Sequence, residues 1–293
     1  MIISASYRTD IPAFYSEWFF ARLQAGFCEV VQPFSRQRSR VDLRRSAVDG
    51  MVFWTRNFAP MLARLDELRQ FGAPFYVQFT LTGYPREIEA SVIAAERAVA
   101  QLHALRERCG PRAVVWRYDP VLISSLTPAE FHRRNFAALA QQVQGATDEV
   151  VVSFAQAYQK TRRNLDEAAR RSGFVWRDPE DEEKRALLAD LAATAQAFGL
   201  RLTVCSQAAC LVPGAEAARC IDTHRLSDCA GYAIAGRQKG NRPDCLCAES
   251  RDIGDYDTCP HGCAYCYAVR SQTLARARYH RHEPESPALA KRP

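Results

Sequence analysis

The sequence predicts an α/β fold, a TIM-like (β/α) barrel that is closed or incomplete, followed by a C-terminal cysteine-rich segment. Short apolar runs alternate with amphipathic helical patterns along the first 207 residues. About seven such units fit this length, which favours parallel strands joined by crossover helices. Beyond residue 207 both periodicities fade, and Gly, Pro, Asp and Cys dominate up to residue 268. A doubly wound open sheet is the alternative fold with the same alternation.

The predicted strands are short and rich in β-branched and aromatic residues, as buried parallel strands are. They cover residues 2–6, 29–34, 51–55, 75–82, 113–119, 149–154 and 201–205.

The predicted helices lie between these strands at residues 12–26, 58–72, 87–108, 129 onward and 179–198. Gly26 and Gly72 end the first two, because glycine readily takes the left-handed conformation after a helix. Thr127 and Glu130 have capping-box spacing, with Pro128 between them at the expected first helical position.

The chain is expected to divide into three parts. Residues 1–207 form the barrel, 208–268 form a cysteine-rich segment that docks on it, and 269–293 form a basic tail. The chain has 293 residues and a net charge of +6, so it is only mildly basic. Its tail can contact phosphate, which keeps nucleic acid as a candidate partner, although most such tails are simply solvated. No apolar run reaches the roughly 20 residues of a membrane span, and no secretory signal is apparent. We therefore expect a cytoplasmic protein without membrane partners.

Cysteine is concentrated near the C-terminus. Nine of the 11 cysteines lie between Cys205 and Cys266, and only Cys28 and Cys109 precede them. In a long cytosolic chain this distribution indicates metal or cluster binding before it indicates disulfides. Cys28 and Cys109 are expected to pack in the protein interior.

The densest motif is C-x3-C-x2-C, formed by Cys259, Cys263 and Cys266. Three thiolates can hold three irons of a 4Fe–4S cluster, and the fourth iron then stays open to another ligand. Gly262 would let the loop bend tightly around the cluster. A zinc site that uses His261 as its fourth ligand is the alternative, and reactive thiols or a chance grouping are the remaining ones.

With Tyr265 before the last cysteine, the motif resembles the cluster motif of the radical S-adenosylmethionine (SAM) superfamily. The resemblance implies SAM as a second cofactor, bound at the open iron, and an electron donor such as flavodoxin or ferredoxin. A 5′-deoxyadenosyl radical would then act on a substrate that is a small molecule or nucleotide-like. It also implies that the backbone near Tyr265 contacts the adenine.

The position of the motif departs from that superfamily, where it usually follows the first barrel strand. Here it comes after 258 residues, and no Gly-Gly-Glu-type stretch stands at a strand end. The position of the motif would still agree with that superfamily if the C-terminal loop returns to the mouth of a barrel whose first strand is 2–6.

A second group of cysteines precedes the first. It could bind an auxiliary 4Fe–4S cluster or a zinc ion, and its members are Cys205, Cys220, Cys245 and Cys247. Cys210 and Cys229 are spare candidates for the same site.

Charged residues follow several predicted strands, where the chemistry of a parallel α/β barrel collects. Arg8 and Asp10 follow the first strand, and Arg117 and Asp119 share one face of the fifth. We predict these four as catalytic residues of a polar pocket for an anionic or zwitterionic ligand, in which Arg56 could also act as a clamp. The alternative is a set of internal salt bridges, for example between Arg117 and Asp10 or Asp119.

Several longer motifs occur together in this chain: SYRTDIPAFYSEWF, VFWTRN, QFTLTGY, VWRYDPVL and CLCAESRDIGDYDTCPHGCAYCYA. In this order they resemble domain-of-unknown-function family 1848, which implies a barrel-like fold and iron–sulfur binding. Gln207 stands where the resemblance leads us to expect an acidic residue. Three functions are therefore open: a radical SAM-type enzyme, a non-enzymatic iron–sulfur or zinc protein, and a nucleic-acid-modifying protein.

Overall fold

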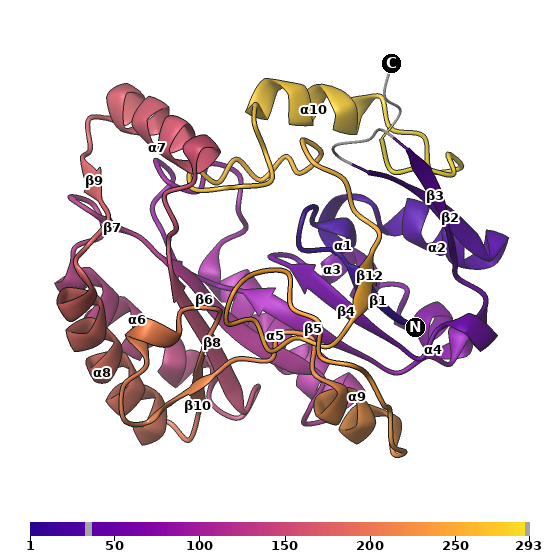
Figure 1. The fold of residues 1–293 in the computed structure, drawn as a ribbon, viewed down its shortest axis with the longest axis horizontal. Coiled ribbons are helices and arrows are strands. Elements are labelled where there is room, and N and C mark those ends of the chain that lie inside the picture. The colour runs from indigo at the N-terminus through magenta and orange to yellow at the C-terminus, as the bar shows by residue number, and fades with distance from the viewer. Residues whose placement is uncertain (33–36, 291–293) are drawn as a thin grey trace.

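The main sheet has eight strands, and every pair of neighbours in it is parallel (Figure 1). The computed structural model describes residues 1–32 and 37–290. The sheet contains β1 (Ile2–Ala5), β4 (Gly50–Thr55), β5 (Phe75–Thr80), β6 (Val114–Val121), β8 (Glu149–Phe154), β10 (Arg201–Val204), β11 (Ala215–Ala217) and β12 (Ser250–Asp252).

The strand order is β11-β10-β8-β6-β5-β4-β1-β12. From β1 to β11 the strands follow one another in chain order across the sheet, and β12 then returns to pair beside β1. The register places Ile2 opposite Ser250 and Ser4 opposite Asp252. Within residues 1–32 and 37–290, β11 and β12 each pair with one strand of this sheet, so the described sheet is open at both edges.

Helices cover one face of the sheet. Alternate strand residues such as Met51, Trp116 and Val150 pack with helical residues such as Leu102 and Leu188 in the largest apolar cluster. Over the described residues the helices are α1 (Ile11–Phe14), α2 (Ser16–Ala25), α3 (Ala59–Leu62), α4 (Leu65–Phe71), α5 (Ala95–Cys109), α6 (Ala129–Val143), α7 (Gln159–Ser172), α8 (Asp181–Ala197), α9 (Thr223–Ala230) and α10 (Gln272–His280), with short 3-10 turns at Arg45–Ala47 and Ala208–Cys210. Of these, α9 packs on the opposite face and α7 packs in the cluster that contains Cys263.

The cysteine-rich segment covers the opposite face (Figure 1). Val52 and Tyr76, which point to this face, pack against Cys220 and Leu226. The Tyr76 hydroxyl also donates to the backbone oxygen of Cys220 at 2.8 Å. The segment supplies both β11 and β12, so it is built into the sheet as well as lying across it.

Two small antiparallel pairs lie outside the main sheet: β2 (Phe27–Val31) with β3 (Arg38–Asp42), and β7 (Ile123–Ser124) with β9 (Trp176–Arg177). The predicted strand 29–34 therefore belongs to a hairpin and not to the main sheet, and its last two residues lie outside the described ranges.

Two helix predictions need correction. The pattern at 87–108 becomes helical only from Ala95, since residues 88–91 make backbone contacts with the cysteine loop instead. The predicted capping box at Thr127 and Glu130 is wrong. The Thr127 hydroxyl donates to the oxygen of Leu122 at 2.6 Å, and Pro128, not Thr127, occupies the N-cap position.

The C-terminal segment packs on the fold. The Trp18 indole donates to the oxygen of Ser286 at 2.8 Å, and Leu289 is buried in the largest apolar cluster.

In the described part of the chain, no helix combines the length and apolar character that crossing a membrane requires.

His132 on α6 is fully buried between Tyr118 and the backbone oxygen of Leu122, at 2.9 and 3.0 Å. Burial lowers the pKa of His132 to about 4. The unfolded chain therefore binds more protons between pH 6.5 and 4, and we expect the free energy of unfolding to fall by roughly 3 kcal/mol as the pH drops through this window. Urea unfolding at several pH values checks this, and His132→Gln should show a flatter dependence. An equal slope in the two proteins would contradict the assignment.

Candidate functional site

The three cysteines of the C-x3-C-x2-C motif lie on the loop that follows β12. This loop docks on residues 88–91: Ala264 N–H donates to the oxygen of Ile88, and Ser91 N–H donates to the oxygen of His261, both at 2.9 Å. Gly262 has a φ of +77°, and a Cβ there would lie 3.1 Å from the side chain of Ala90. A glycine is therefore required for both the turn and the close approach.

Burial dominates the electrostatics of the three thiols. It raises the pKa of Cys263 to about 12 and raises the pKa values of Cys259 and Cys266. The thiols also oppose one another's ionisation, because a thiolate at Cys263 or Cys266 further raises the pKa of Cys259. Converting all three to thiolates therefore requires a positive charge among them.

A buried polar network lies beside this loop. Arg56, which follows β4, pairs with Glu89 at 3.0 Å and donates to the Thr82 hydroxyl at 3.2 Å. Thr82 donates in turn to Glu89 at 2.6 Å. Tyr265 of the cysteine loop donates to Glu89 and accepts from Arg56. These contacts fasten the loop to the carboxyl ends of β4 and β5.

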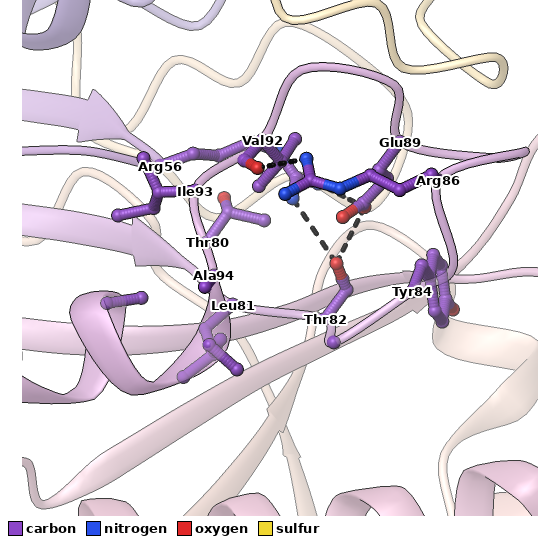
Figure 2. A pocket seen from close by; sticks show the side chains of 13 residues that line it. Arg56, Thr80, Leu81, Thr82, Tyr84, Arg86, Glu89, Val92, Ile93 and Ala94 are labelled. Atoms are coloured by element: carbon purple, nitrogen blue, oxygen red, sulfur yellow. Dashed lines mark hydrogen bonds and ion pairs between the residues drawn. The ribbon is translucent and has the colours of Figure 1, made fainter.

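The same network borders a cavity of about 180 Å³ between the end of β5 and the start of α5 (Figure 2). Figure 2 shows Arg56, Thr82 and Glu89 linked by their hydrogen bonds, and Val92 and Ile93 also line the cavity. Pockets for drug-sized ligands usually measure about 300–1,000 Å³. This cavity can therefore hold only part of a cofactor-sized ligand.

Asp10 connects the first strand to the cysteine loop. Its carboxylate accepts hydrogen bonds from the Thr55 hydroxyl, from Arg56 N–H and from His261 Nε2, each at 2.7 Å. The other ring nitrogen of His261 faces the oxygen of Ser91 at 3.5 Å. Both nitrogens of His261 thus have protein partners, which favours a positioning role for this residue over metal ligation.

Arg8 pairs with Asp252 at the end of β12, with Nη2 to Oδ1 at 2.8 Å. Both side chains are buried. The pair ties β1 to β12 immediately before the cysteine loop. The predicted catalytic residues Arg8 and Asp10 therefore both contact the segment that carries Cys259.

Arg117 and Asp119 lie at the carboxyl end of β6 and pair with each other. Arg117 Nη1 also lies 3.1 Å from the Cys220 sulfur, and the Ser153 hydroxyl donates to Asp119. The predicted salt bridge thus exists, with Asp119 and not Asp10 as the partner. These two residues accompany the second group of cysteines.

The structure brings all four cysteines of that second group together: Cys205, Cys220, Cys245 and Cys247. The Cys220 thiol lies 3.5 Å from the Cys205 sulfur, Cys247 is buried in the same cluster, and Cys245 packs against that cluster. The hydrogen bond from Cys247 lowers the pKa of Cys245 to about 5. Of the spare candidates, Cys210 is buried in the largest apolar cluster, and the Cys229 thiol faces the oxygen of Arg112.

Taken over residues 1–32 and 37–290, no group of three or more His, Cys, Asp or Glu side chains already has the geometry of a metal site. Gln207 is engaged elsewhere, since its side chain pairs with both backbone groups of Phe154.

Sequence reasoning missed Asp252, Glu89 and Arg242. Arg242 Nη2 lies 3.5 Å from the Cys205 sulfur. Asp252 ends a strand of three residues that has no apolar run, and Glu89 lies inside a pattern that reads as helix. The sequence did offer one signal for these residues. Asp252 lies within a motif shared with the family, and Glu89 and Arg242 are charged residues close in sequence to such motifs.

Comparisons with known proteins add one firm result. No curated protein matches this chain. A solved structure from Bacteroides thetaiotaomicron VPI-5482, described as a "putative alpha-L-fucosidase", shares 12% identity over 87% of this chain and 93% of that one. Its TM-score is 0.26, so the likeness carries no argument about fold or function. The model of a domain of unknown function, DUF1848, matches residues 2–268. This match spans nearly the whole chain, and the chain therefore belongs to the DUF1848 family.

Proposed function

We propose that this chain is an iron–sulfur enzyme of the radical SAM type, acting on a small-molecule or nucleotide-like substrate. The observation that carries the proposal is the place of the three-cysteine loop, directly after the edge strand β12 and beside β1. The superfamily that the motif resembles carries it after the first barrel strand. In the spatial order of the sheet, β12 is the edge strand beside β1 and so takes the place of a first strand, although it comes last along the chain. The same strand order supports an open (β/α) barrel that begins at β12.

The residues of the loop suit a 4Fe–4S cluster by their chemistry. Cys259, Cys263 and Cys266 would each hold one iron, since soft thiolates are the ligands that such clusters take. The raised pKa values of the three thiols mean that they need a cationic partner to ionise, and a cluster would provide one. When bound, such a cluster would offer its open iron to SAM and supply the electron that splits SAM into methionine and a 5′-deoxyadenosyl radical.

The protein's own side chains hold this loop and shield it. Arg56, Glu89 and Tyr265 fix its C-terminal part, and Asp10 fixes His261 near its start. Backbone groups near Tyr265 would contact the adenine of SAM. Cys263 is buried, whereas Cys259 and Cys266 are half-buried, so the loop leaves partial access to the site.

Among the predicted catalytic residues, Asp119 is the strongest candidate for substrate contact. Its side chain is 18% exposed, whereas those of Arg8 and Arg117 are 8% and 5% exposed. Arg8, Asp10 and Arg117 already have buried partners and would shape the pocket. A flavodoxin or ferredoxin would deliver the electron, and the reducing conditions that this chemistry requires suit the cytoplasm.

The test is anaerobic reconstitution with iron and sulfide, followed by incubation with SAM and dithionite. We expect about four irons per chain, as in other 4Fe–4S sites, and release of 5′-deoxyadenosine. Cys263→Ala should lose both, because it removes one of only three ligands. Cys109→Ala, which changes a cysteine at the end of α5, is the matched control and should retain both.

Deoxyadenosine production that persists in Cys263→Ala would refute the ligand assignment. A cluster whose electron paramagnetic resonance spectrum ignores SAM would instead indicate an electron-transfer protein, because only an open iron can respond. Protein that binds zinc but no iron would exclude the radical chemistry altogether.

A further inference from the structure

We infer that Cys205, Cys220, Cys245 and Cys247 bind one zinc ion at a closed, four-thiolate site. This site is separate from the loop 259–266 and does not depend on the function proposed above. Cys205, Cys220 and Cys247 are buried in one cluster, Cys245 packs against it, and the Cys205 and Cys220 sulfurs lie 3.5 Å apart. They come from three different parts of the chain: Cys205 follows β10, Cys220 follows β11, and the other two precede β12.

The distance between the Cys205 and Cys220 sulfurs favours a single ion over a cluster. Tetrahedral zinc binds thiolates at about 2.3 Å, which places neighbouring sulfurs roughly 3.8 Å apart. The Cys205 and Cys220 sulfurs lie 3.5 Å apart, close to this value. The cysteines of a 4Fe–4S cube bind different irons, so their sulfurs lie much farther from one another. Four thiolates also fill every position of a tetrahedral ion, as in structural sites.

The surroundings balance the charge of such a site. Zinc with four thiolates keeps two negative charges in excess, and two guanidinium groups adjoin the sulfurs. Arg117 Nη1 lies 3.1 Å from the Cys220 sulfur, and Arg242 Nη2 lies 3.5 Å from that of Cys205. Ile221 N–H donates to the Cys247 sulfur at 3.4 Å. Donors of this kind commonly support metal-bound ligands from outside the first shell.

The segment that carries these cysteines has little else to hold it. Between α9 and β12, residues 231–249 contain no helix or strand, and most of their side chains are exposed. A structural zinc would fasten this stretch to the ends of β10 and β11, where a small apolar contact alone supplies little stability. The site therefore closes the cysteine-rich segment over the sheet.

The experiment measures zinc, iron and sulfide in the full-length protein purified without oxygen. We expect about one zinc per chain in the wild type, as a single tetrahedral site requires. Cys247→Ser should lose the zinc, because it removes one of the four ligands. Cys229→Ser, a nearby cysteine outside the group, should keep it, and so should Cys263→Ala from the other loop.

A second measurement covers the case in which Cys247→Ser does not fold. Zinc-edge X-ray absorption of the wild type should show four sulfur ligands at about 2.3 Å. Nitrogen or oxygen ligands in the first shell would overturn the inference. So would zinc that disappears in Cys263→Ala, wild type without stoichiometric zinc, or extra iron and sulfide that disappear in Cys247→Ser, which would indicate an auxiliary cluster. The zinc content tests this proposal, whereas production of 5′-deoxyadenosine tests the proposed function. Either proposal can therefore fail while the other holds.

Discussion

Replacing Asp252 by alanine should lower the free energy of unfolding by about 3–5 kcal/mol, the usual cost of removing one partner of a buried ion pair. Its carboxylate accepts from Arg8 Nε and Nη2, at 2.9 and 2.8 Å, and from the hydroxyls of Ser4 and Ser6, at 2.9 and 2.7 Å. Gly254 N–H donates to it as well, at 3.0 Å. Alanine leaves the Arg8 charge buried without its partner, and the Ser4 and Ser6 hydroxyls that lose this acceptor are buried as well.

Urea unfolding followed by circular dichroism measures this effect. Asp252→Asn keeps one acceptor oxygen and should fall between the wild type and Asp252→Ala. The matched control is Asp66→Ala, which breaks the exposed pair with Arg69 and should change stability by less than about 0.5 kcal/mol. If Asp252→Ala proved as stable as this control, the Arg8 pair could not be what joins β12 to β1.

The same contact explains why β12 could not be predicted from the sequence. Its three residues, Ser250–Asp252, contain no apolar run. They form a strand because β1 offers a free edge and because Asp252 finds Arg8 and Ser4 across it. Such a strand depends on tertiary contacts, which a local pattern does not record.

Six of the predicted strands belong to the main sheet, and unlike β12 each could be predicted because it contains an apolar run. Strands such as β8 are buried on both faces, so that Val150 and Val152 pack against helices while Val151 packs against the cysteine-rich segment. Burial on both faces produces a continuous apolar run, and that run is visible in the sequence. The hairpin strand β2 has a similar composition, which is why its exclusion from the sheet could not be foreseen.

The residues of the candidate site were also only partly predictable from the sequence. The spacing of Cys259, Cys263 and Cys266 and the closeness of the other cysteines in the sequence singled out both groups, and in the structure Cys205, Cys220, Cys245 and Cys247 gather in one cluster. Metal binding by either group stays a prediction. The carboxylates that support the loops were not identifiable. Glu89 was assigned to a helix, and only the folded chain shows it beside Tyr265.

Glu89→Ala should also lower the free energy of unfolding by about 3–5 kcal/mol, for a related reason. Glu89 and Arg56 are 2% and 7% exposed, so Arg56 would keep a buried charge without its carboxylate. The Thr82 and Tyr265 hydroxyls would lose their shared acceptor at the same time.

The double variant Arg56→Met with Glu89→Leu separates charge burial from simple loss of contact. Replacing both partners by apolar groups of similar size removes the unpaired charge, so this variant should be more stable than Glu89→Ala. Glu67→Ala, which breaks an exposed pair with Arg64, is the control and should match the wild type. A double variant less stable than Glu89→Ala would show that the hydrogen bonds of the network outweigh its charge.

The two variants should differ in stability but act on the cysteine loop in the same way. The backbone bridge between Glu89 and Cys263 does not use the Glu89 side chain, so it can survive in both variants. The hydroxyl of Tyr265, however, donates to the Glu89 carboxylate, and both variants remove this acceptor. If fixing Tyr265 is what holds the thiols in place, both variants should retain less iron after reconstitution than Glu67→Ala, even where the double variant has recovered stability. Full iron retention in the recovered variant would mean that the backbone bridge alone positions the loop.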